Sequence, residues 1–179
     1  MSVFQAVTPR TAGFNTADLN KMSDAGRSVM MLLMLIGGSP GSTAGGMKTT
    51  TIAVLFANAI AVFRKRQNAN CYGRRIDDST VKNASAILFM YVFFSMLSAI
   101  IISITDGISM QMGMFETFSA IGTVGLTLGI TPTLSAVSRF VLILLMFFGR
   151  VGGLTIIYAA FSQKDASTLK YPMENITVG

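Results

Sequence analysis

Long apolar runs separated by short polar segments dominate the pattern of this chain. Residues 86–104 (AILFMYVFFSMLSAIIISI) hold no charged side chain, and a helix of that length crosses a hydrocarbon core of about 30 Å. Another run begins at residues 140–149 and continues past Arg150 as far as Phe161. Both runs predict membrane-spanning helices, the second of them over residues 136–162.

Residues 27–63 form a third apolar segment, which glycine and proline interrupt. As one helix it would be about 55 Å long at about 1.5 Å per residue, too long for an upright crossing. Its middle reads GGSPGSTAGGMKTTT (residues 37–51), where Pro40 and five glycines are expected to break the helix inside the membrane. The freed backbone groups must then face protein or water, so we expect the break to line a water-filled path.

The glycines and threonines around Lys48 are also typical of phosphate-binding loops. Such a loop requires G-x-x-x-x-G-K-[ST] between a strand and a helix. Gly41 and Gly46 have the required separation, but Met47 stands between Gly46 and Lys48, so the register fails. Because a lysine costs about 3 kcal/mol in lipid, Lys48 is predicted to have a function beside the break, with snorkelling to the inner surface as the alternative.

Composition supports a membrane protein, because 51% of the residues are hydrophobic and only 12% are charged. A soluble domain carries about 25% charged residues. The net charge of +6 is concentrated in residues 64–82, which hold six Lys and Arg side chains. Between two spans such a loop is predicted to be cytoplasmic rather than to bind nucleic acid, and the tail 163–179 falls on the same side. We therefore predict an all-α, multi-pass protein of the plasma membrane.

The chain also matches itself when Thr11 is placed on Thr123, a shift of 112 residues. In this register identical residues coincide at Gly13 and Gly125, Ser23 and Ser135, Arg27 and Arg139, and Gly37 and Gly149. Each copy holds a short apolar segment, a T-x-G-[FL] turn, a polar loop and a long helix directed inward. The short segments, SVFQAVTPR and QMGMFETFSAIG, cannot cross a membrane and are predicted to be re-entrant pore helices.

The two T-x-G turns follow these re-entrant segments. Potassium channels replace the water around an ion by rings of backbone carbonyls, and glycine permits the backbone angles that such a ring needs. A single turn of this kind would be read as a helix C-cap, whereas two in one register favour a filter. The predicted filter residues are Thr11, Ala12, Gly13, Phe14, Thr123, Val124, Gly125 and Leu126.

Several stretches resemble one known family. TPRTAGFNT, GGSPGSTAGGMKTTT, SAIGTVGLTLGIT and FGRVGGLT are similar to pore segments of the bacterial Trk/Ktr/HKT potassium transporters, and KYPMENITVG is most similar to the membrane subunits of Ktr systems. In that family four M1–pore loop–M2 repeats of the potassium-channel-like type surround one ion path. The resemblance therefore implies a third-repeat pore loop and broken M2 helix (1–66), a cytoplasmic basic loop (67–83), a fourth repeat (84–162) and a cytoplasmic tail (163–179).

The resemblance also implies a function and partners. It implies potassium uptake through the filter, with sodium as an activator and the broken helix as an intramembrane gate. The gate residues that correspond are Gly41, Ser42, Thr43, Gly45, Gly46, Lys48 and Arg150. The implied partners are the N-terminal repeats, a second copy in a homodimer, membrane lipid and a KtrA-like cytosolic ring, through which alone nucleotide would act.

Two charged side chains near the path carry predictions of their own. Arg150, opposite Gly38 in the repeat and about 21 Å along its helix, is expected to repel a cation, to hold the loop by hydrogen bonds, or to have a structural role alone. Glu116 is expected to stabilise the positive end of the pore helix, with attraction of cations at the outer mouth as the alternative.

Three other functions fit these residues less well. A secondary transporter with discontinuous helices would have paired breaks in both copies and acidic residues at mid-depth, which the sequence does not display. An enzyme would need a nucleophile–base pair or a phosphate loop, so no enzyme activity is expected. A non-conducting membrane scaffold remains the other alternative.

Overall fold

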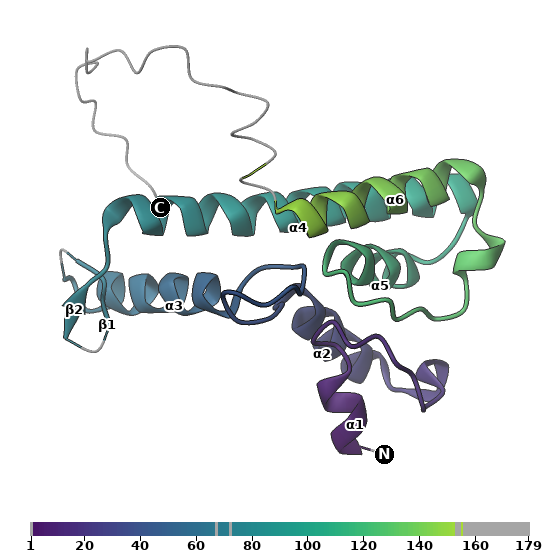
Figure 1. Ribbon diagram of the computed structural model, residues 1–179. Coiled ribbons are helices and arrows are strands. Elements are labelled where there is room, and N and C mark those ends of the chain that lie inside the picture. Colours follow the sequence, from purple (N-terminus) through teal and green to yellow (C-terminus); the bar gives the residue numbers. More distant parts are fainter. Residues whose placement is uncertain (1, 67, 72, 153–154, 156–179) are drawn as a thin grey trace, which may run out of the picture.

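The computed structural model describes residues 2–66, 68–71, 73–152 and 155, and most of these residues are helical (Figure 1). The elements in chain order are α1 (Ser2–Val7), the short 3-10 turn η1 (Leu19–Lys21), α2 (Asp24–Leu35), α3 (Thr49–Phe63), β1 (Asn70–Cys71), β2 (Arg74–Arg75), α4 (Asp78–Asp106), α5 (Met110–Ile121), η2 (Thr131–Thr133) and α6 (Ala136–Val151). The helical content agrees with the predicted all-α class. The small antiparallel hairpin of β1 and β2, inside the predicted basic loop, was not predicted.

In the described part of the chain, α4 alone is long and apolar enough to cross a membrane. It begins after Asp77 and ends at Gly107, whose φ of 65° suits the left-handed end of a helix. Large apolar side chains stand exposed along it, among them Phe89 at 68% and Ile104 at 79% exposure. Such a surface is unusual on a soluble monomer and is expected of a helix that faces lipid.

The helix expected over residues 27–63 consists of α2 and α3, separated by residues 36–48, which we call the interrupting loop. Backbone hydrogen bonds close its base, because the Gly37 N–H donates to the Met47 carbonyl at 2.7 Å and the Met47 N–H donates to the Leu35 carbonyl at 3.1 Å. The Thr49 N–H donates to the Gly38 carbonyl at 3.2 Å. The break is therefore a structured loop whose ends are tied together.

The prediction of a continuous helix over residues 136–162 was wrong in the described part of that range. α6 ends at Val151, where Gly152 has a φ of 86° that only glycine adopts without strain. Beyond it only Thr155 is described; the rest of the predicted span and the predicted tail 163–179 lie outside the described residues.

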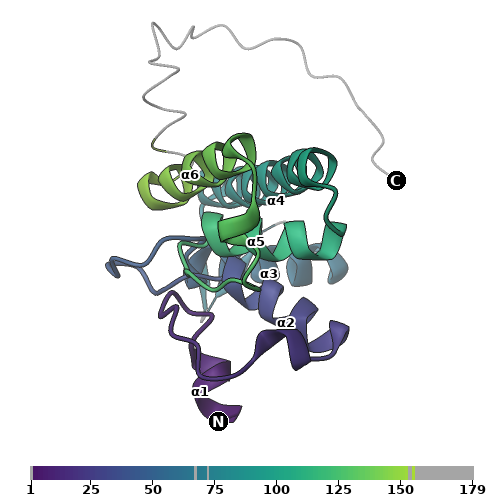
Figure 2. The ribbon, with the colours of Figure 1, turned by 90° about the vertical axis from the view of Figure 1, so that its right-hand side faces the viewer.

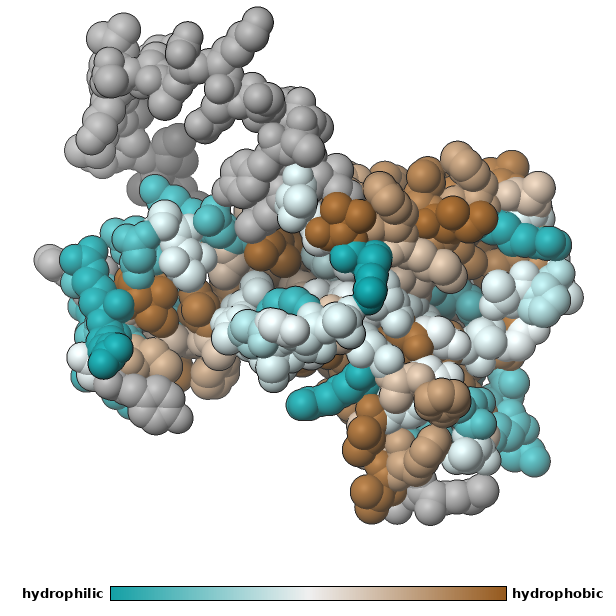
Figure 3. All heavy atoms as spheres, viewed as in Figure 1, coloured by the Kyte–Doolittle hydropathy of each residue, from teal (hydrophilic) through white to brown (hydrophobic). Residues whose placement is uncertain are grey.

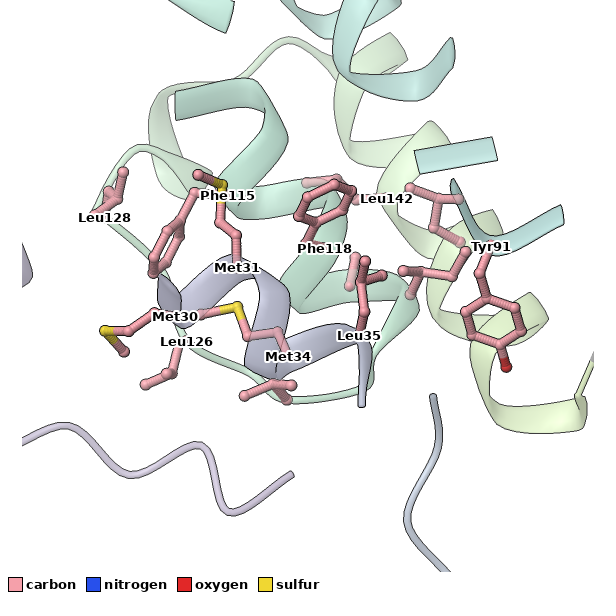
Figure 4. Packing of buried hydrophobic residues seen from close by; sticks show 14 of the residues in the cluster. Met30, Met31, Met34, Leu35, Tyr91, Phe115, Phe118, Leu126, Leu128 and Leu142 are labelled. Atoms are coloured by element: carbon pink, nitrogen blue, oxygen red, sulfur yellow. The ribbon is translucent and has the colours of Figure 1, made fainter. Parts of the chain in front are cut away.

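The buried pore-helix candidate α5 lies at the centre of the packing, with α4 and α6 side by side on one face and α2 on another (Figures 1 and 2). Methionines and leucines of α2 meet the phenylalanines of α5 in one apolar cluster, which includes Met30, Met31, Met34, Leu35, Phe115, Phe118 and Leu142 (Figure 4). Two glycines allow backbone to approach α5 closely. A Cβ on Gly149 would lie 1.9 Å from the Ile121 carbonyl oxygen, and one on Gly122 would lie 2.3 Å from the Met34 carbonyl oxygen.

Hydropathy varies along the length of the molecule. Hydrophobic residues cover much of α6 on the face in Figure 3, whereas hydrophilic residues gather near the β1–β2 hairpin and at the opposite end of α6. The exposed apolar residues of α6 are Val137, Phe140, Ile143, Leu144, Met146, Phe147 and Val151. This distribution fits a protein whose middle is in lipid and whose ends are in water.

Candidate functional site

The two T-x-G turns, residues 11–14 (the first turn) and 123–126 (the second turn), share an unusual backbone. Thr11 and Thr123 have φ angles of 60° and 52°, and Gly13 and Gly125 have φ angles of 72° and 89°. A positive φ is rare for a residue with a Cβ and strained for a β-branched one. Such strain persists only where the surroundings impose it, and it gathers at functional sites.

The structure brings the two turns together although 112 residues separate them in the sequence. A Cβ on Gly13 would lie 2.3 Å from the Val124 carbonyl oxygen, and one on Gly125 would lie 4.0 Å from the Gly13 Cα. The Val124 oxygen is therefore directed toward the first turn. Carbonyl and hydroxyl oxygens at this junction are ligands of the kind that hold alkali cations.

A buried carboxylate supports the second turn. Glu116 is only 4% exposed; its Oε1 accepts hydrogen bonds from the Thr127 hydroxyl at 2.6 Å and from the Leu128 N–H at 3.0 Å. Its Oε2 accepts one from the Thr131 hydroxyl at 2.9 Å. The prediction that Glu116 stabilises the positive end of the pore helix was wrong, because the residue lies in the middle of α5 and three donors from residues 127–131 bind its oxygens. The alternative, attraction of cations, stays a prediction, since Glu116 is among the residues that line the cavity described below. A buried charge must be paired in this way, so Glu116 fixes the segment that follows the turn.

A single hydroxyl supports the first turn. Thr8 is 1% exposed; its hydroxyl donates to the Phe14 carbonyl, and its own carbonyl accepts from the Ala12 and Gly13 N–H groups at 3.2 and 3.3 Å. The Phe14 oxygen is therefore directed at Thr8, while the Phe14 side chain is 73% exposed.

The interrupting loop contacts Thr123, the first residue of the second turn. The Gly45 N–H donates to the Thr123 hydroxyl oxygen at 3.1 Å. A Cβ on Gly45 would lie 2.2 Å from that oxygen, so the absence of a side chain permits the contact. The loop base is buried at Gly45 and Gly46, whereas its tip around Gly41 is exposed and has open space beside it.

Two cationic side chains hold three consecutive carbonyls of this loop. The Lys48 ammonium donates to the Ser42 oxygen at 3.0 Å and to the Ala44 oxygen at 2.7 Å, and the Arg150 guanidinium donates to the Thr43 oxygen. Lys48 is thus directed back at the loop. Hydrogen bonds from a charged donor are about twice as strong as neutral ones, so these contacts restrain the loop more than the Gly45 bond does.

A cavity of about 750 Å³ lies beside the second turn and against α6. Thr123, Gly125, Thr127 and Arg150 are among the residues that line it. Polar groups of the turn and the guanidinium that holds the loop therefore face the same space.

Sequence reasoning missed Thr8, Thr127, Thr131 and Asn20, whose amide donates to the Leu128 carbonyl at 3.2 Å. The repeat conceals two of them, because Thr127 and Thr131 coincide with Asn15 and Leu19 in the first copy. A polar residue where the repeat has an apolar one, as at Thr131, was the available signal.

The predicted basic loop lies at the far end of α3 and α4 from these turns (Figure 1). Its cations Arg64, Lys65 and Arg66 are exposed, and Arg75 pairs with Asp78 at 3.4 Å. The hydroxyl of Ser79 donates to Asp77, which holds the pKa of that carboxyl below its ordinary value. The loop thus presents positive charge to solvent.

Known proteins resemble this chain over nearly all its length. The family model described as TrkH, cation transport protein, matches residues 1–169. The potassium/sodium uptake protein NtpJ of Enterococcus hirae is 40% identical over 182 residues, which cover 98% of this chain and 40% of that protein. The Ktr system potassium uptake protein B of Bacillus subtilis is 38% identical over 178 residues (99% and 40%), and that of Vibrio alginolyticus is 34% identical over 176 residues (98% and 38%). The chain spans about two fifths of the length of these curated relatives.

Proposed function

This chain belongs to the TrkH family of cation transport proteins, and we propose that it forms part of a pathway for potassium uptake across the cell membrane. The observation that carries the proposal is the contact between two turns of the same strained backbone, with the Val124 oxygen directed at Gly13. The names of the similar proteins, which are potassium or potassium/sodium uptake proteins, support potassium as the ion.

In this proposal the turns contribute part of a selectivity filter. Oxygens of residues 11–13 and 123–126 would take the place of water around a dehydrated cation, as carbonyl rings do in potassium channels. The Phe14 oxygen has the weakest claim to this role, because the Thr8 hydroxyl already donates to it. Glycine at positions 13 and 125 supports the proposal, since a side chain at Gly13 would collide with the Val124 oxygen.

The interrupting loop is the proposed gate. Its Gly45 contacts the second turn, Arg150 lines the cavity beside that turn, and Lys48 and Arg150 hold the loop's carbonyls. Each charge-assisted bond contributes about 1.5–3 kcal/mol, so the closed position is stable unless another contact replaces them. Arg150 would also place a positive charge in the path of a cation.

The proposed assembly includes further pore segments, a second copy of the chain and lipid around the apolar faces of α4 and α6. The basic loop 64–82 and the C-terminal tail would be cytoplasmic, under the positive-inside rule, and would meet a nucleotide-binding regulatory ring. Sodium would act as an activator.

A secondary transporter is the second candidate, and one observation favours it. α6 stops at Val151, and Gly152 coincides with Pro40, which lies inside the interrupting loop, so both copies are interrupted in the same region of the repeat. Against it, the buried carboxylate near the site, Glu116, already accepts three hydrogen bonds from the chain itself.

The test uses a chimera in which this whole chain replaces the matching region of the Bacillus subtilis relative. The chimera is produced in a bacterial strain that lacks potassium uptake. We expect growth at low potassium and uptake of radioactive rubidium. Gly125→Ala should abolish uptake, whereas Gly107→Ala should leave uptake unchanged. Both glycines have a positive φ, but only Gly125 lies in a T-x-G turn. Absence of uptake by a chimera that is present in the membrane in normal amounts would contradict the proposal.

A further inference from the structure

We propose that the interrupting loop and a potassium ion compete for the hydroxyl oxygen of Thr123, so that a cation bound there releases the loop from the second turn. The inference rests on the proposed function and deepens it. It adds a direct link between occupancy of the filter and position of the gate.

The geometry crowds the two occupants on one side of the hydroxyl. The Gly45 N–H donates to the Thr123 oxygen at 3.1 Å, and a Cβ on Gly45 would lie 2.2 Å from that oxygen and 2.6 Å from the Thr123 Cγ2. Backbone of the loop therefore lies directly against one side of the hydroxyl, and the cavity beside the second turn lies within reach of the same residue. The positive φ of Thr123, 52°, sets the direction in which its Cβ leaves the backbone.

The two occupants also oppose each other electrostatically. A threonine hydroxyl can donate one hydrogen bond and accept with its oxygen lone pairs. An amide N–H presents its positive end to the same oxygen that a cation would use. Each occupant thus lowers the affinity of the hydroxyl for the other, and this coupling is reciprocal.

The equivalent threonine of the first turn provides an internal contrast. Thr11 has nearly the same φ as Thr123, and in the described residues no hydrogen bond joins its hydroxyl to the loop. A cation could use either hydroxyl, but only at Thr123 would it displace the loop. Loss of a ligand and loss of the loop contact can therefore be separated by changing one threonine at a time.

The contact has a strength that a cation could overcome. It is one neutral hydrogen bond, whose loss changes the ratio of released to docked loop by about fivefold. The bonds from Lys48 and Arg150 are charge-assisted and remain when this one breaks. The base of the loop also stays closed by the Gly37–Met47 hydrogen bond. We therefore expect potassium to loosen the loop by about this factor and not to open the gate alone.

The experiment uses the same chimera, freed of other cysteines by Cys71→Ser and equivalent changes, with a spin label at Ser39→Cys on the exposed tip of the loop. Label mobility is measured while potassium replaces N-methylglucamine at constant ionic strength. We expect potassium to raise the ratio of mobile to immobile label about fivefold. Thr123→Val should give a mobile label without potassium and no further response, whereas Thr11→Val and Thr123→Ser should keep the response.

Gly45→Ala gives a second route that leaves the threonine intact. The added methyl group collides with the Thr123 hydroxyl, and Gly45 lacks a positive φ, so the change should release the loop without straining its backbone. A potassium response that persists in Thr123→Val, or its absence from the unaltered chimera while rubidium flux is normal, overturns the inference and leaves the proposed function standing. Absence of flux from the unaltered chimera overturns the proposed function itself.

Discussion

In the first copy of the repeat one hydroxyl, that of Thr8, holds the turn, whereas in the second copy the Glu116 carboxylate accepts three hydrogen bonds behind it. The repeat register places Phe4 opposite Glu116, so the carboxylate has no counterpart in the first copy. The two turns nevertheless share their positive φ angles. The backbone turn is thus the common feature, and the side chains that support it differ.

The two copies also differ at the glycine near the end of the helix that follows each turn, because that glycine lies against a different part of the chain in each copy. Gly37 and Gly149 coincide in the repeat, and both allow close approach to a carbonyl oxygen. A Cβ on Gly149 would meet the Ile121 oxygen at the end of α5, whereas one on Gly37 would meet the Gly45 oxygen in the interrupting loop at 2.1 Å. At this position the second copy therefore packs α6 against the end of α5, whereas the first copy packs two segments of the interrupting loop against each other.

The largest expected effect comes from removing the carboxylate. Glu116→Leu leaves the buried Leu128 N–H without its acceptor, which costs about 1–3 kcal/mol, and it also removes the acceptor of the Thr127 and Thr131 hydroxyls. We expect loss of rubidium uptake and a marked fall in the thermal midpoint of the purified assembly. Thr8→Val removes one hydrogen bond and should cost about 1 kcal/mol. Equal losses from the two changes would mean that the turns are equally supported.

The next effect separates packing from loop position. Gly149→Ala forces a methyl group against backbone inside packed helices, which typically costs about 1–3 kcal/mol, and should lower the thermal midpoint. Gly37→Ala should displace the loop and raise flux with a smaller change in stability. Thermal unfolding and rubidium flux on both variants measure the two outcomes. If Gly37→Ala unfolds the assembly as readily as Gly149→Ala, the loop is part of the rigid packing.

The Arg150 contact with the loop is expected to have a smaller effect, confined to flux. Arg150→Ala removes a charge-assisted bond to the Thr43 carbonyl. Flux in liposomes should rise about tenfold, because an exposed bond of this kind contributes near the lower end of about 1.5–3 kcal/mol. Unchanged flux would leave Arg150 a structural role alone.

Two conservative variants separate the roles that the sequence left open for Arg150. Arg150→Gln keeps an N–H donor without the charge, and Arg150→Lys keeps the charge without the planar group. If the guanidinium acts by holding the loop, Arg150→Gln should stay near the unaltered flux. If the guanidinium acts by repelling cations, Arg150→Lys should instead be the variant whose flux stays near that of the unaltered protein.

The class and family of the chain were predictable because their signals are local. Apolar runs and four glycine-rich motifs pointed to a helical membrane protein and to the Trk/Ktr/HKT transporters, and the family match over residues 1–169 confirms that membership. The break near Pro40 also follows from local backbone chemistry.

The supports of the turns depend on the tertiary fold and could not be predicted from the sequence. Residues 127–131 return to α5 only in the folded chain, so the role of Glu116 was missed. The end of α6 depends on the φ of Gly152, which was expected to be helical. The filter and gate roles of the turns and the loop stay predictions.

The smallest expected effect concerns a hydrogen bond that joins the two copies of the repeat. The amide of Asn20, an exposed residue, donates to the Leu128 carbonyl at 3.2 Å, next to the Leu128 N–H that Glu116 accepts. Asn20→Ala removes one partly exposed neutral bond, so we expect a loss of at most about 1 kcal/mol and normal flux. Asn20→Ala combined with Glu116→Leu should add little to the effect of Glu116→Leu alone, because both act on one segment. Full additivity in thermal unfolding would mean that the first copy supports the second turn independently of the carboxylate.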